Sequence, residues 1–142
     1  MWIEGVAMVG SEADIIEAFV RHNLQFLNHL TVLCHQPTDD TAAILAALVQ
    51  EGLPLQVLEP AFAGFQQGAE LTRVAKAVFA AGCDFVVPLD ADEFIKLPRP
   101  DYLRAALPAI PGDRFGCVRW QNYAPLDPAD CQQSNPLVGL VH

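Results

Sequence analysis

Three carboxylates crowd into the four residues Asp90-Ala91-Asp92-Glu93, directly after the apolar run 85–89. The run has the length and composition of a buried strand, which places the carboxylates at the strand's exit. We expect an extended segment there, in which side chains alternate between faces and Asp90 and Asp92 point the same way. Like charges this close repel unless a cation lies between them, and oxygen ligands suit Mg²⁺ or Mn²⁺. The spacing predicts a divalent metal site on Asp90 and Asp92, with a solvated acidic turn as the alternative.

The composition predicts one globular α/β domain over residues 1–142. The chain has 142 residues, of which 52% are hydrophobic, enough for one core. Its formal net charge of -9 argues against a nucleic-acid or anionic membrane partner, because phosphate-rich partners attract clustered Lys and Arg. We find neither a basic-then-apolar leader nor an unbroken apolar segment of about 18 residues. We therefore expect a cytoplasmic protein with no transmembrane segment.

The cysteines do not form a metal or redox motif. Cys34, Cys83, Cys117 and Cys131 lie far apart, and no Cys-x-x-Cys pair is present. Zinc knuckles and redox pairs use closely spaced cysteines, so these four are predicted to be free thiols.

Short apolar runs alternate with helical stripes along the first 89 residues. Strands are predicted at 3–9, 30–34, 55–58 and 85–89. Helices are predicted to begin at Ser11 as a capping residue, near residue 38 or 39, and near Glu70, and Gly52 is expected to end the second helix. This alternation predicts a three-layer α/β/α fold with a mainly parallel sheet. Pro88 lacks a backbone donor, so we place it near the end of its strand.

The remaining segments are less periodic. Residues 59–68 carry Gly and Pro and are expected to form a loop. A short helix is predicted near 101–107 and a strand at 114–120. The tail 121–142 is expected to be irregular, with at most a short strand at 136–141.

Three stretches of the chain resemble the family 2 glycosyltransferases, which are nucleotide-sugar-dependent enzymes of the GT-A (Rossmann-like) fold. Residues 8–16 are similar to the family's first strand-to-helix turn, residues 38–41 to the second, and residues 88–94 to the metal-binding segment. The resemblance implies transfer of a sugar from a nucleotide-diphosphate donor to an unknown acceptor. It also implies Mn²⁺ or Mg²⁺ held by Asp92, and by Asp90 through water.

The same resemblance implies which residues contact the nucleotide sugar. They are Val9, Ser11, Glu12, Cys34, Asp39, Asp90 and Ala91. In an open parallel sheet, ligands bind outside the carboxyl ends of the strands where the strand order reverses. All three resembling stretches follow predicted strands, so we expect them to border one crevice.

The second of these turns departs from the family pattern at two positions. Cys34 stands where relatives carry an Asp that contacts the base or ribose, and a thiol is a weaker hydrogen-bond acceptor than a carboxylate. Asp40 stands where the family usually has Gly, which matters if that position needs positive φ. Both differences are expected to weaken binding of the nucleoside.

The family's general base belongs to a later part of the fold, and the catalytic residue here is unknown. Asp113, Asp127 and Asp130 are available acids, but none lies in a motif that matches the family. The acceptor-side portion is therefore expected to be short or missing, and the fold truncated.

Two further interpretations remain open. One is a catalytically weak or inactive nucleotide- and metal-binding remnant of a glycosyltransferase. The other is a phosphotransfer protein built on Asp90 and Asp92. We rank the second last, because nucleophilic Asp pairs of that kind normally follow the first strand of their fold and this pair follows the fourth.

Overall fold

The computed structural model describes residues 1–61, 66–112, 114–119, 121–122, 124–125 and 140–141. The chain divides into two compact units, Met1–Lys96 and Leu97–His142, each of which is described by itself. A single functional domain over 1–142 stays a prediction.

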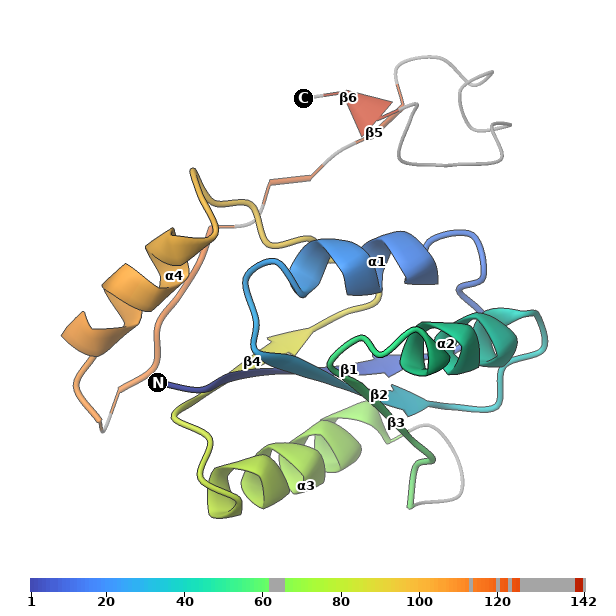
Figure 1. The fold of residues 1–142 in the computed structure, drawn as a ribbon, viewed down its shortest axis with the longest axis horizontal. Helices are drawn as coiled ribbons and strands as arrows, with labels where there is room; N and C mark the ends of the chain where they lie inside the picture. The colour runs from blue at the N-terminus through green and yellow to red at the C-terminus, as the bar shows by residue number, and fades with distance from the viewer. Residues whose placement is uncertain (62–65, 113, 120, 123, 126–139, 142) are drawn as a thin grey trace. The chain divides into compact units, whose positions relative to one another are not determined.

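The first unit is a parallel sheet with helices on both faces. Its elements are β1 (Ile3–Val9), α1 (Ile16–Asn23), β2 (His29–Cys34), α2 (Thr41–Gln50), β3 (Leu55–Leu58), α3 (Gln67–Ala80) and β4 (Phe85–Leu89). All strand pairs are parallel, in the order β3-β2-β1-β4. Helices α1 and α2 cover one face and α3 the other (Figure 1). The predicted three-layer α/β/α architecture is confirmed.

Burial explains why these segments form strands and helices. Every residue of β1 is buried, as a strand needs when it lies in the middle of a sheet that has helices on both faces. Helix α1 buries Ile16, Phe19 and Val20 along one stripe. Helix α2 buries Leu45 and Leu48 and ends before Gly52, whose φ of 85° is the left-handed conformation expected there.

Two of the predicted helix starts are wrong. Helix α1 begins at Ile16 rather than Ser11, with no capping bond from a side chain. Helix α3 begins at Gln67, inside the segment 59–68 that was expected to be a loop. Residues 62–65 of that segment lie outside the described part of the chain. Local capping chemistry did not fix the start of α1, because the Ser11 hydroxyl bonds Thr38 instead.

Strand β4 lies at an edge of the sheet that the structure describes. Pro88 is its second-to-last residue and is exposed. A missing backbone donor is tolerated at such a position, so the expected placement of Pro88 is confirmed.

The second unit contains α4 (Asp101–Ala106), the 3₁₀ turn η1 (Leu107–Ala109), and the short antiparallel pair β5 (Ala124–Pro125) and β6 (Leu140–Val141). The predicted helix near 101–107 is confirmed. The tail was expected to hold at most a short strand at 136–141; β6 lies there, but β5 is a second strand in the tail, so this expectation is wrong in part. The predicted strand at 114–120 is wrong: residues 114–119 have no regular structure and are exposed, and residue 120 is not described. A β-rich run needs a neighbouring strand, and none of the described strands pairs with this one.

Two other expectations are tested by the described residues. Cys34, Cys83 and Cys117 are free thiols, whereas Cys131 lies outside the described residues. Within the described ranges, no helix has the length and apolar character needed to cross a lipid bilayer. The cytoplasmic location stays a prediction.

Candidate functional site

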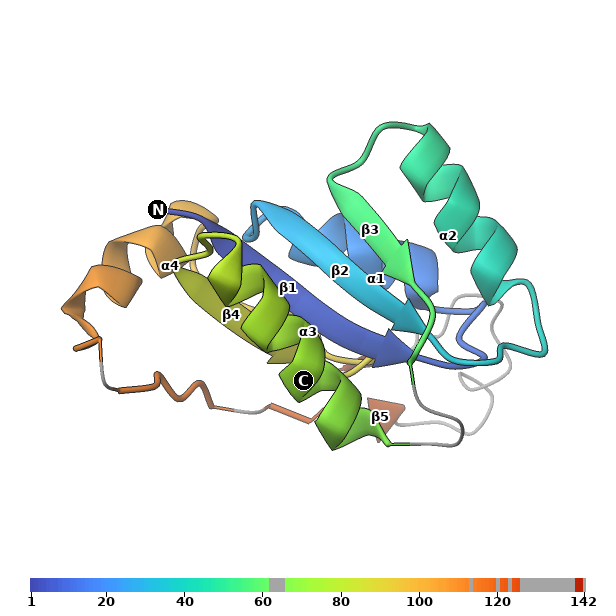
Figure 2. The ribbon, with the colours of Figure 1, turned by 90° about the horizontal axis from the view of Figure 1, so that it is seen from below.

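The carboxyl ends of β1, β2 and β4 meet at one edge of the sheet, and the strand order reverses between β1 and β4 (Figure 2). The acidic side chains that follow these strands lie close enough to interact. Burial raises the pKa of the Glu12 carboxyl. The negative charges of Asp14, Asp92 and Asp39 raise it further. The three predicted turns therefore border one region, as the sequence led us to expect.

The turn after β1 is bonded to the turn after β2. The Thr38 amide donates to Ser11 Oγ at 2.9 Å, and the two hydroxyls of these residues lie 3.0 Å apart. The Glu12 amide donates to Thr41 Oγ1 at 2.7 Å. The hydroxyl of Ser11 therefore bridges two turns instead of capping α1, which explains the late start of that helix.

Asp39 is the centre of this brace, the bonded set Ser11, Glu12, Thr38, Asp39 and Thr41. Its Oδ2 accepts from the Ala13 amide at 3.0 Å. Its Oδ1 accepts from the Thr41 amide at 3.0 Å and from the Thr41 hydroxyl at 2.5 Å. The Thr41 hydroxyl, followed by the backbone amides, lowers the pKa of Asp39. Both carboxylate oxygens of Asp39 thus bind protein, and its contact with a nucleotide stays a prediction.

Thr41 lies in the resembling stretch 38–41 but was assigned no role from the sequence; it is fully buried and its hydroxyl joins both turns. The available signal was the spacing Asp39-x-Thr41, in which an Asp side chain accepts from the amide two residues on. Val9, at the end of β1, is also buried, and its carbonyl accepts from the His35 amide at 2.8 Å.

A surface hollow of about 530 Å³ opens at the ends of β2 and β3. Cys34, Gln36, Ala42 and Glu59 are among the residues that line it. Burial raises the pKa of the Cys34 thiol, and the charges of Asp39 and Glu59 raise it further. Cys34 therefore presents a neutral thiol, a weak hydrogen-bond acceptor.

Asp40, at the position where the resembled family usually has Gly, has no backbone strain. Asp40 has a φ of −76°, which any residue adopts. The positive φ of this loop lies instead at Gln36, at 44°. The expected cost of losing a glycine at position 40 does not arise.

The acidic turn, residues 90–93, is closed by two hydrogen bonds. The Glu93 amide donates to the Asp90 carbonyl at 3.0 Å, and the Asp90 amide donates to the Glu93 carboxylate at 2.9 Å. The expected extended segment is therefore wrong, because the Glu93 carboxylate binds the chain back on itself. Ala91 is half-buried at the middle of the turn.

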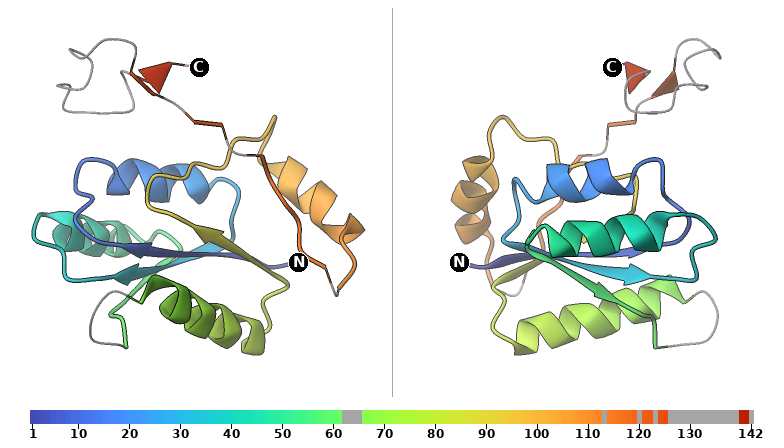
Figure 3. Two further views of the ribbon diagram at one scale, coloured as in Figure 1. Left: turned by 180° about the vertical axis from the view of Figure 1, so that it is seen from behind. Right: turned by 45° about the vertical axis from the view of Figure 1, so that its right-hand side comes forward.

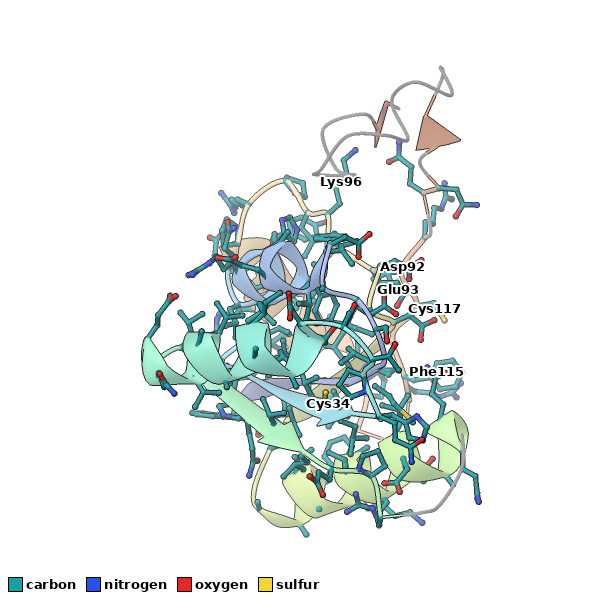
Figure 4. The ribbon with its side chains drawn as sticks, turned by 90° about the vertical axis from the view of Figure 1, so that its right-hand side faces the viewer. Cys34, Asp92, Glu93, Lys96, Phe115 and Cys117 are labelled. Carbon is teal, nitrogen blue, oxygen red and sulfur yellow. The ribbon has the colours of Figure 1, made fainter. Side chains whose placement is uncertain are left out.

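The three carboxylates of the acidic turn differ in what they bind. Glu93 is occupied by the Asp90 amide, and Asp90 Oδ1 accepts from Gln67 Nε2 at 2.8 Å. The Asp92 carboxylate is exposed and has no hydrogen-bond or ion-pair partner among the described residues. Figure 4 shows Asp92 and Glu93 on the segment that follows β4, and Cys34 at the end of β2.

The residues present fit a divalent ion that is shared with a ligand. Over the described ranges, no group of three or more His, Cys, Asp or Glu is arranged to hold a metal by itself. Mg²⁺ and similar hard cations need only one or two carboxylates when phosphate and water oxygens supply the other ligands. Asp92 offers such a carboxylate, with Asp90 two residues away.

Comparisons with known proteins give fold-level matches. No family model and no curated protein matches the chain. Among solved structures, the mannosyltransferase PcManGT from Pyrobaculum calidifontis in complex with GDP-Man and Mn²⁺ matches with a TM-score of 0.54 and 22% identity. The match covers 74% of this chain and 31% of that one.

A glucosyl-3-phosphoglycerate synthase from Mycobacterium tuberculosis, in complex with Mn²⁺, UDP and glucosyl-3-phosphoglycerate, has a lower TM-score of 0.46 at 22% identity. That match covers 72% of this chain and 37% of the synthase. The likeness to the mannosyltransferase shows the fold: this chain has a GT-A, Rossmann-like α/β fold, as predicted, over about a third of that structure's length.

Proposed function

We propose that this chain is a glycosyltransferase-like protein of family 2 that binds a nucleotide-diphosphate sugar together with Mn²⁺ or Mg²⁺. The metal would be held by Asp92, and by Asp90 through water. The observation that carries the proposal is the exposed Asp92 carboxylate, which lacks a protein partner in the described structure and lies where the strand order reverses. The fold shared with the mannosyltransferase supports it.

A bound divalent ion would neutralise the charge that develops on the leaving diphosphate. The chain's own residues would position that ion. Gln67 holds one oxygen of Asp90, and the Glu93 carboxylate closes the turn, so the backbone around Asp92 is fixed. Asp92 is then free to turn its oxygens to the cation.

The hollow beside Cys34 is the proposed place of the nucleoside. Its volume of about 530 Å³ lies within the range of roughly 300–1,000 Å³ that is usual for small-molecule sites. Val9, Ser11, Glu12, Asp39 and Ala91 remain proposed nucleotide-sugar contacts. Ser11 and Asp39 are bonded within the brace, so we propose that they support ligand binding mainly by holding the two turns in position.

No general base is assigned. Asp113, Asp127 and Asp130, the acids considered from the sequence, lie outside the described residues. A missing base would forfeit proton transfer, worth roughly 10²–10⁴-fold in rate.

The second candidate is a nucleotide- and metal-binding protein with little transferase activity. It is favoured by the neutral Cys34 thiol at the hollow and by Asp39, whose oxygens are both bonded within the protein. Both features weaken the hold on the nucleoside without affecting Asp92.

An assay with a panel of UDP- and GDP-sugars separates the two candidates. Donor hydrolysis and transfer to a broad set of acceptors are measured with Mn²⁺ for the full chain, Asp92→Ala and Cys34→Asp. Because no general base is assigned, we expect little or no transfer, as the second candidate predicts, with any donor hydrolysis lost in Asp92→Ala. Robust, Asp92-dependent transfer would reject the binding-only candidate, and turnover unaffected by Asp92→Ala would overturn the metal role.

A further inference from the structure

We propose that Asn23 is a positioning residue that holds the acidic turn in the conformation that exposes Asp92. The inference rests on the proposed function, and it concerns a residue on α1 that lies outside the predicted motifs. Asn23 is the last residue of α1 and is fully buried. A buried amide side chain is costly unless its polar groups are bonded, so the partners of Asn23 are informative.

Both ends of the Asn23 amide bind the segment that leaves the acidic turn. Its Nδ2 donates to the Glu93 carbonyl at 2.9 Å, and its Oδ1 accepts from the Ile95 amide at 2.9 Å. The two backbone groups flank Phe94, so Asn23 bonds this segment as a neighbouring strand would. One buried side chain thus satisfies two backbone groups that follow the turn.

Aromatic packing holds the same segment against α1. The ring of Phe94 meets Phe19 edge-on, with centroids 6.3 Å apart, and meets His22 edge-on at 5.3 Å. His22 Nε2 lies 2.7 Å from the Ile95 carbonyl. Figure 3 shows the chain after β4 running beside α1. Residues 93–95 are therefore fixed to the helix by bonds and by packing.

We call the contacts of Phe19, His22 and Asn23 with residues 93–95 the clamp. Glu93 links the clamp to the acidic turn. Its carbonyl is held by Asn23, and its carboxylate closes the turn on the Asp90 amide. From the other face of the sheet, Gln67 of α3 holds the Asp90 carboxylate. The acidic turn is thus anchored by α1 on one side and α3 on the other, and Asp92 is the carboxylate of the turn left available to a cation. The loss of a residue that orients a metal ligand typically weakens metal binding by about 10–100-fold.

The test compares Asn23→Ala with Asn28→Ala in the full chain. Asn28 Oδ1 accepts from the Ile3 amide at 2.9 Å, so the control also loses an asparagine-to-backbone bond, but at the amino end of β1. Phe94→Leu is a second variant that loosens the clamp without leaving a buried polar group unbonded. Amide hydrogen exchange of residues 90–95 is measured without metal, and Mn²⁺ affinity is measured by calorimetry in the presence of UDP or GDP.

We expect Asn23→Ala to speed exchange at residues 93–95 and to weaken Mn²⁺ binding by about 10–100-fold, with Phe94→Leu intermediate. Asn28→Ala should change neither quantity. Native exchange and wild-type Mn²⁺ affinity in both clamp variants would overturn the inference. A wild-type protein that binds no Mn²⁺ with either nucleotide would overturn the proposed function instead, and unchanged exchange in Asn23→Ala would then also reject the clamp.

Discussion

Two polar regions at the same edge of the sheet use their side chains in opposite ways. In the brace, Asp39 and Thr41 bind backbone groups and each other. In the acidic turn, Asp90 and Glu93 are bonded to protein, whereas Asp92 has no such partner in the described structure. Turns leave backbone amides that must be bonded, and polar side chains near them meet that need first. A carboxylate at this edge becomes a candidate direct ligand of a cation only when the protein does not already bind it; Asp90, bonded to Gln67, is proposed to act through water.

The largest effect is expected from the acidic turn. Asp92→Ala removes the carboxylate proposed to bind the cation. The Kd of this variant for Mn²⁺, measured in the presence of UDP or GDP, should rise by about 100-fold or more. Losing a residue that only orients a metal ligand typically costs about 10–100-fold, and losing the ligand itself should cost at least as much as the upper end of that range. Asp14→Ala is the control, because it removes one negative charge near Glu12 without touching the turn. Equal weakening by both variants would mean that Asp92 acts through general charge alone.

Breaking the brace should lower the free energy of unfolding rather than the affinity for Mn²⁺. Thr41→Val removes the acceptor of the Glu12 amide and a donor to Asp39 while keeping the side chain's shape. Leaving the half-buried Glu12 amide unbonded should cost about 1–3 kcal/mol of unfolding free energy. Urea unfolding measures it, with the exposed Thr72→Val as the matched control, expected within about 0.5 kcal/mol of wild type. A neutral Thr41→Val would show that the brace does not stabilise the fold.

The brace should also depend on pH in a defined direction. Hydrogen bonds lower the pKa of Asp39 below its ordinary value of 3.8, so its ionised form stabilises the fold above that pH. The contribution is lost as the pH falls through the lowered pKa. The gap in urea midpoint between wild type and Asp39→Asn should be full at neutral pH and shrink below pH 3.8. Asp40→Asn supplies the matched charge change, and a gap that stays constant with pH would contradict this role of Asp39.

The smallest effect concerns the hollow at the end of β2. Because burial raises the pKa of the Cys34 thiol, iodoacetamide should alkylate Cys34 several-fold more slowly than the exposed Cys117. Peptide mass spectrometry measures both rates in one sample. Adding Mn²⁺ and UDP or GDP should slow alkylation at Cys34 alone. Equal protection of both thiols would argue against a nucleoside in the hollow.

The strands were predictable because their signals are local. The predicted strands 3–9, 55–58 and 85–89 match the bounds of β1, β3 and β4, since each is a short apolar run next to Gly, Pro or Asp. The run 114–120 shows the limit of this signal. Its described residues, 114–119, form no strand, because a strand needs a partner and pairing is not encoded in the run itself.

The site was predictable in place but not in detail. The spacing after the strands located the edge where Glu12, Asp39 and Asp92 interact. The hydroxyl of Ser11 had two possible uses, capping its own helix or binding Thr38, and only the packed sheet decides between them. The contacts of Asn23 with residues 93–95 join positions about 70 apart in sequence, so no local pattern contains them.

The most direct test of the account is a calorimetric titration of the full chain with UDP and with GDP, each with and without Mn²⁺. The account predicts weak binding of at least one of the two nucleotides that requires Mn²⁺ and disappears in Asp92→Ala. Binding of equal affinity without metal, or no binding of either nucleotide with Mn²⁺ present, would contradict it.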